Sequence, residues 1–174
     1  PALQHSYKTG WTLTLFKQMA ELNTPFMIDK SKKPLMLRIS FEDTMPQNLR
    51  YLYENVHYNK HGELPDISKI SYEKMANEVI STITKKGYFV IMRRVDATRW
   101  TYKDLFNYIL DLESQVYEIH LCMLDYLSLL PKTGCEEGPM GHSLRDLYRR
   151  VRAFFSARKI TCLTPHQLST EAKQ

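Results

Sequence analysis

Residues 118–130, with the sequence EIHLCMLDYLSLL, determine the fold class that we predict for this chain. The run from Glu118 to Asp125 is apolar apart from His120, and it ends in an aspartate. A strand that is buried on both faces of a parallel sheet has this continuous apolar character. We therefore expect a buried parallel strand here, with a carboxylate at its carboxyl end.

Strand-like runs and segments of helical period alternate on both sides of this strand. Further strands are expected at 34–41, 88–92 and 160–163, and helices at 10–22, 46–58, 72–86, 101–115 and 144–155. Strands that are separated by helices of this length need right-handed crossovers, which predicts an α/β fold with a mainly parallel sheet and helices on both faces. Ligands of such sheets bind beyond the carboxyl ends of the strands.

Length and composition exclude several classes of protein. The 174 residues correspond to about one domain, and 43% of them are hydrophobic. No stretch approaches the roughly 20 apolar residues that cross a bilayer, so no membrane partner is expected. The net charge of +5 permits binding to a polyanion without requiring it. Three cysteines without a CxxC pair, and no secretory signal, indicate a reducing, cytoplasmic setting.

Lys8 and Thr9 stand before the first predicted helix and match the second half of a phosphate-binding loop. In such a loop the N–H groups at the helix start hold phosphate, the lysine neutralises it and the hydroxyl binds Mg²⁺. A Lys-Thr pair alone is common, so the other interpretation is a solvent-exposed lysine at the start of a helix.

Three more polar residues follow predicted strands. Asp125 has the position of a Walker B carboxylate, which holds Mg²⁺ through a water, or else it caps the next turn. Glu42 could activate the water that attacks a γ-phosphate, or be a solvated charge at a loop start. Gln167 could hydrogen-bond the γ-phosphate and report its presence, or be an exposed loop residue. Their common position at strand ends favours the functional interpretation of each.

The order of these motifs resembles the hexameric replicative DNA helicases of the DnaB type, including phage versions, over nearly the whole chain. Their Ser-hydrophobic-Glu motif is matched by residues 40–42, and the Met and Pro that follow it by Met45-Pro46. The strongest local match is MLDYLSLL at 123–130, which is similar to the family's Asp-Tyr-Leu Walker B strand. The family's Ser-Gln-Leu-like element is matched by residues 166–169.

The resemblance implies a RecA-like P-loop NTPase core that spans 1–174 as part of a longer helicase and is incomplete at both ends. The strand before the phosphate loop and the family's arginine finger would lie outside these residues. The implied activity is ATP-dependent translocation on single-stranded DNA with unwinding of duplex DNA. The implied cofactors are ATP and Mg²⁺.

The resemblance also assigns roles to particular residues. The implied nucleotide-binding set comprises Ser6, Lys8, Thr9, Gly10 and Asp125. Within it Lys8 would contact the β- and γ-phosphates, while Thr9 and Asp125 would hold the metal. Glu42 would activate water, and Gln167 would couple the state of the γ-phosphate to loops that grip DNA.

Partners follow from the same resemblance. The loop 131–142 corresponds to a DNA-gripping loop, and Lys132 and Thr133 are its candidate contacts with single-stranded DNA. The chain would work as a homo-oligomer, a hexameric ring, with a primase or a helicase loader as a further partner, in a bacterial cytoplasm if a phage encodes it. Arg145, Arg149 and Arg152 would share one helix face, either touching DNA or a neighbouring subunit or simply solvated.

Two alternatives remain open. A RecA-type recombination ATPase would have the same fold. A non-hydrolysing RecA-like subunit that binds DNA or a partner is favoured by Ala2 and Tyr7, because a phosphate loop aligned on Lys8 and Thr9 has glycine at both positions. His57 and His61 could ligate a metal only if one helix held both, and the polar NKHG stretch at 59–62 favours a loop.

Overall fold

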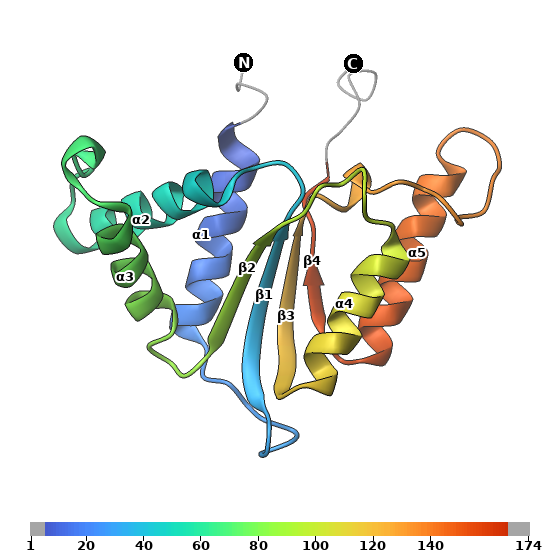
Figure 1. Cartoon of the computed structure of the whole chain (residues 1–174), viewed down its shortest axis with the longest axis horizontal. Helices are drawn as coiled ribbons and strands as arrows, with labels where there is room; N and C mark the ends of the chain where they lie inside the picture. The colour runs from blue at the N-terminus through green and yellow to red at the C-terminus, as the bar shows by residue number, and fades with distance from the viewer. Residues whose placement is uncertain (1–5, 167–174) are drawn as a thin grey trace.

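A four-stranded, all-parallel sheet with the strand order β2-β1-β3-β4 forms the centre of the computed structural model, which describes residues 6–166 (Figure 1). The strands are β1 (Lys33–Ser40), β2 (Phe89–Arg94), β3 (Tyr117–Asp125) and β4 (Thr161–Leu163). The helices are α1 (Ser6–Leu22), α2 (Met45–His61), α3 (Tyr72–Ile83), α4 (Tyr102–Ser114) and α5 (His142–Ala157), with short 3-10 helices η1 (Ile67–Lys69) and η2 (Leu127–Leu129). The predicted α/β class with a parallel sheet is confirmed.

Helices cover both faces of the sheet, and each face buries its own set of apolar side chains. Figure 1 shows α1, α2 and α3 on one side and α4 and α5 on the other. Because side chains alternate along a strand, Leu37 and Ile39 of β1 pack under α4 and α5, whereas Met36 packs under α1 to α3. The continuous apolar character of the strands therefore reflects burial on both faces.

The first helix begins at Ser6, earlier than the sequence predicts. Consequently Ser6, Lys8, Thr9 and Gly10 all belong to the first turns of α1, and the Lys-Thr pair does not precede the helix as predicted. The physical reason is local, because no residue from Ser6 to Thr9 is a glycine or proline that would disfavour helical geometry.

Helices α2 and α3 also end at residues other than those predicted. Helix α2 continues to His61 and ends at Gly62, whose φ of 76° suits the left-handed C-cap position. One helix therefore holds both His57 and His61, with ring centroids 4.4 Å apart, so the predicted loop is wrong. Helix α3 ends at Ile83, because the Thr84 hydroxyl donates to the Ile80 carbonyl and Gly87 turns the chain towards β2 with a φ of 98°.

Within residues 6–166, no helix combines the length and the apolar character needed to cross a membrane.

The α4 helix offers a matched test of this packing. Leu105 is fully buried between the sheet and α5, whereas Leu110 on the same helix is 38% exposed. We expect Leu105→Ala to lower the free energy of unfolding by about 2–5 kcal/mol, because it removes buried methyl groups and leaves a cavity. Leu110→Ala should change it by about 0.5 kcal/mol or less. Urea unfolding of both variants measures this, and equal losses would contradict the packing described here.

Candidate functional site

The carboxyl ends of the two central strands lie side by side at one end of the sheet. Ser40 of β1 is in register with Asp125 of β3, and the Phe41 N–H donates to the Asp125 carbonyl at 2.9 Å. Helix α1 packs against β3 and begins at the same end of the molecule (Figure 1). The first turns of α1, which contain Lys8 and Thr9, and the end of β3 at Asp125 therefore lie at the same end of the molecule.

Glu42 and Tyr126 meet across this end of the sheet. Glu42 follows β1 and is exposed, whereas Tyr126 follows β3 and is buried. The Tyr126 hydroxyl donates a hydrogen bond to Glu42 Oε2. Burial raises the pKa of Tyr126, and the hydrogen bond to the Glu42 carboxylate raises it further. The Tyr126 phenol therefore stays protonated at neutral pH. By donating its hydrogen bond, it fixes the orientation of the Glu42 carboxylate.

Asp125 forms an ion pair with Arg38 that the sequence analysis did not anticipate. Arg38 lies in the middle of β1, and its Nη2 is 2.6 Å from Asp125 Oδ2. The two side chains are 0% and 2% exposed, so the pair is dry. Burial lowers the pKa of Arg38, while the Asp125 carboxylate opposes this shift and favours the charged guanidinium.

The same guanidinium is tied to the start of α2. Arg38 Nη2 also donates to Asn48 Oδ1 at 3.0 Å. The Asn48 amide nitrogen in turn donates to the Thr44 carbonyl at 3.0 Å, and the Ser40 hydroxyl donates to the Asp43 carbonyl at 3.1 Å. The loop that carries Glu42 is therefore held at both ends by polar contacts to β1 and α2.

These residues do not fit the predicted divalent cation at Asp125. Mg²⁺ binds carboxylate oxygens and waters in octahedral geometry, but one oxygen of Asp125 already carries a guanidinium. The other, Oδ1, is buried and has no hydrogen-bond partner among the described residues. Thr9 is 6% exposed within α1. Residues 6–166 also hold no group of three or more His, Cys, Asp or Glu side chains that could bind a metal.

The loop between η2 and α5 carries the predicted DNA contacts. The Lys132 ammonium donates to the Ser128 carbonyl at 2.6 Å, so it folds back onto the chain, whereas Thr133 is exposed. Asp146 of α5 anchors the loop, because its Oδ2 accepts from the Glu136 N–H at 2.9 Å and from Arg150 Nε at 2.6 Å.

One residue of the predicted basic face of α5 is part of this anchor. Arg149 pairs with Asp146 at 2.7 Å and with Glu136 at 2.8 Å. Arg145 and Arg152 are exposed. Of these three arginines, only Arg149 takes part in holding the loop, and Arg145 and Arg152 lie at the surface.

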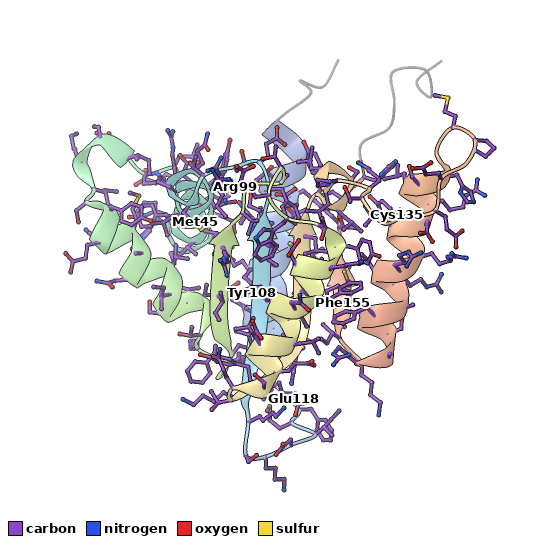
Figure 2. The ribbon with its side chains drawn as sticks, turned by 45° about the vertical axis from the view of Figure 1, so that its right-hand side comes forward. Met45, Arg99, Tyr108, Glu118, Cys135 and Phe155 are labelled. Atoms are coloured by element: carbon purple, nitrogen blue, oxygen red, sulfur yellow. The ribbon has the colours of Figure 1, made fainter. Side chains whose placement is uncertain are left out.

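The opposite end of the sheet is a separate region. Figure 2 shows Glu118 at the end of the molecule away from Met45, the first residue of α2. Here a cavity of about 430 Å³ is lined by Glu118, His120 and residues of α1 and β4. His120 Nε2 lies 3.1 Å from Glu118 Oε1, so this histidine has a polar partner on the same strand.

Gln167 lies outside the described residues. Sequence reasoning missed Arg38, Asn48 and Tyr126 as parts of the site. A signal for Arg38 was present, because a charged residue in the middle of the apolar run 34–41 needs a buried partner. No local signal pointed to Asn48.

Comparisons with known proteins agree with this architecture. The family model for divergent DnaB-like ATPases matches residues 1–174. A solved DnaB-like replicative helicase, described together with its interactions with primase, is similar over 97% of this chain and 39% of its own, with a TM-score of 0.59 and 16% identity. A second solved structure, of an ATPase domain, is similar over 95% of this chain and 55% of its own, with a TM-score of 0.61 and 14% identity.

At these identities the likeness shows the fold, and it confirms the predicted RecA-like core. The chain spans less than two thirds of the length of either structure. A search of curated proteins found no match.

Asp146 gives a test of how the loop is anchored. Its hydrogen bond with Arg150, together with the Glu136 N–H, holds the pKa of Asp146 well below the ordinary value of 3.8. A carboxyl group with a depressed folded-state pKa stabilises the fold above its unfolded-state pKa, and this contribution is lost as the pH falls below that value. Asp146→Asn should therefore lower stability at pH 7 and have a smaller effect below about pH 4.

Urea unfolding at several pH values measures this difference. Hydrogen exchange should also show faster exchange of the Glu136 amide in Asp146→Asn. The control is Asp111→Asn, which changes an exposed aspartate of α4. A stability loss for Asp146→Asn that is the same at every pH would contradict the ionic anchor.

Proposed function

The chain belongs to the family of divergent DnaB-like ATPases, and on that premise we propose that it hydrolyses ATP to translocate on single-stranded DNA and unwind duplex DNA. One observation carries the proposal. Glu42 stands beyond the end of β1, with its carboxylate held by Tyr126, at the end of the sheet where α1 begins. A general base needs this combination of solvent access and fixed orientation.

In this proposal the nucleotide lies at the start of α1. Backbone N–H groups at a helix N-terminus attract phosphate, and Ser6, Lys8, Thr9 and Gly10 are in the first turns of α1. Lys8 would neutralise the β- and γ-phosphates, and Glu42 would take a proton from the attacking water. Gln167 would hydrogen-bond the γ-phosphate and couple its loss to the DNA-contacting loops.

Single-stranded DNA is the proposed polymer substrate, and the loop 131–142 is its proposed contact. Thr133 is exposed and can reach a backbone phosphate directly. Lys132 would first have to release the Ser128 carbonyl, which its ammonium contacts at 2.6 Å. The exposed Arg145 and Arg152 of α5 would add positive charge near this loop.

We further propose that identical chains assemble as a hexameric ring, and that a primase or a helicase loader is a partner. The support for the primase is that a DnaB-like replicative helicase of similar fold was described with its interactions with primase. The chain covers 39% of that structure's own length.

A second candidate is a non-hydrolysing subunit that binds DNA or a partner. Two observations favour it: Ala2 and Tyr7 replace the glycines of a phosphate loop, and the Asp125 carboxylate is already paired with Arg38. Tyr7→Gly separates the cases. If loop geometry limits binding, nucleotide affinity should rise in this variant, and unchanged affinity would show that Tyr7 is tolerated.

Phosphate release with and without single-stranded DNA tests the leading proposal. Glu42→Gln should lower turnover by about 10²-fold or more, because the general base is lost, and leave nucleotide affinity unchanged. Lys8→Ala should weaken nucleotide binding as well. If wild-type turnover does not exceed that of Lys8→Ala under either condition, the ATPase proposal fails. An assay of strand exchange beside unwinding distinguishes a recombination ATPase.

Tyr126→Phe tests the positioning of Glu42. The change removes one hydroxyl and with it the hydrogen bond to the carboxylate. We expect kcat to fall about tenfold with KM unchanged, because a hydrogen bond to a charged group contributes about 1.5–3 kcal/mol. Tyr108→Phe, on α4, is the control. A fall in thermal stability without any change in kcat would assign Tyr126 a structural role only.

A further inference from the structure

The buried pair between Arg38 and Asp125 has an unusual place in the fold. Arg38 is the only charged residue in the stretch from Pro34 to Phe41, and its side chain is 0% exposed. Asp125 is the last residue of β3, at the position that the sequence analysis assigned to a metal-holding carboxylate. The cation that lies closest to this carboxylate therefore belongs to the protein itself.

The geometry of the pair is fixed by three elements. Arg38 lies on β1, Asp125 on β3 and Asn48 on α2, and one guanidinium nitrogen contacts both partners at 2.6 and 3.0 Å. β1 and β3 are hydrogen-bonded neighbours, with Ser40 opposite Asp125. Neither side chain can move away without breaking contacts that hold the strands and α2 together, so the pairing is part of the folded state.

We propose that the Arg38 guanidinium stands in the place of a divalent cation, so that Asp125 holds no Mg²⁺ in this chain. The charges of the pair balance. A second cation at Asp125 would repel the guanidinium at short range in a site that excludes water, where such repulsion is poorly screened. A metal would also have to displace a charge-assisted hydrogen bond of 2.6 Å.

The other carboxylate oxygen of Asp125, Oδ1, does not offer a binding position for a metal either. Oδ1 has no hydrogen-bond partner within the described part of the chain and almost no accessible surface. A metal-bound water in contact with solvent could not reach Oδ1, because this oxygen is buried. Two donors of Arg38, Nε and Nη1, are buried in the same way, so the region around the pair is closed rather than open to an ion.

This inference rests on the proposed function only for the expectation that a metal accompanies the nucleotide. Its consequence is that any metal brought in with ATP is held by the phosphates and by residues other than Asp125. Asp125 is then a positioning residue, which fixes Arg38 and through it Asn48 at the start of α2.

Mn²⁺ binding followed by electron paramagnetic resonance tests the inference, with the full chain and Mn²⁺ alone as the probe. The key comparison is between the wild type and Arg38→Met/Asp125→Leu. Replacing both charges by apolar side chains of similar volume is often neutral or stabilising, so this variant should fold. We expect the two proteins to bind Mn²⁺ identically. A fall in Mn²⁺ affinity of about tenfold or more in the double variant would overturn the inference.

Arg38→Met alone provides the converse test. It frees the Asp125 carboxylate, and we expect a new Mn²⁺ site with a dissociation constant of about 10⁻³ M or below. Adding Asp125→Asn should remove that site. A folded Arg38→Met protein without the new site would overturn the idea that the guanidinium stands in a cation's place. If Arg38→Met does not fold, the comparison of the wild type with the double variant still tests whether Asp125 contributes to Mn²⁺ binding.

Repeating the titration with a non-hydrolysable ATP analogue separates this inference from the proposed function. If the wild type binds no analogue, the proposed ATPase fails, while the titrations with Mn²⁺ alone still test the role of Arg38. If the analogue binds with Mn²⁺ equally well in the wild type and the double variant, both proposals are supported. A loss of Mn²⁺-dependent analogue binding only in the double variant would overturn the inference and leave the ATPase intact.

Discussion

The positive charge of Arg38 is buried where β1 and β3 lie side by side, so another group of the protein has to neutralise it. Arg38 has no contact with solvent, and Asp125 supplies the balancing charge from β3. Removing one partner of such a pair typically costs about 3–5 kcal/mol, because the other charge remains buried alone. Since Asn48 shares the guanidinium, the same interaction also fixes the start of α2. This ion pair and its contact with Asn48 thus join β1, β3 and α2 next to the loop that carries Glu42.

The parallel sheet explains why chemistry gathers at one end of the molecule. All strands run in the same direction, so Glu42 after β1 and Tyr126 after β3 come together although they are far apart in the sequence. The helices α1 to α3 and α4 to α5 bury opposite faces, which leaves the ends of the strands as the place where polar groups can project. This arrangement is the one in which α/β proteins bind ligands.

Anchoring by buried carboxylates recurs at the loop between η2 and α5. Asp146, like Asp125, is a buried carboxylate that is paired with arginine. It accepts hydrogen bonds from arginine side chains and from a backbone N–H of the loop. The difference is exposure, because Arg149 and Arg150 reach solvent whereas Arg38 does not. Salt therefore weakens the partly exposed ion pairs of the loop anchor more than the buried ion pair of the sheet.

The sequence by itself determined the element types, because apolar periodicity reports burial within one segment. It identified the strand that ends at Asp125 and placed Glu42 at a strand end, and it indicated the DnaB-like family. It misjudged helix ends at Ser6 and His61, where capping and local propensity decide. Only the tertiary structure decided what these residues contact. Arg38 and Asp125 are separated by 87 positions and Tyr126 and Glu42 by 84, and such pairs meet only once the strand order places β1 beside β3.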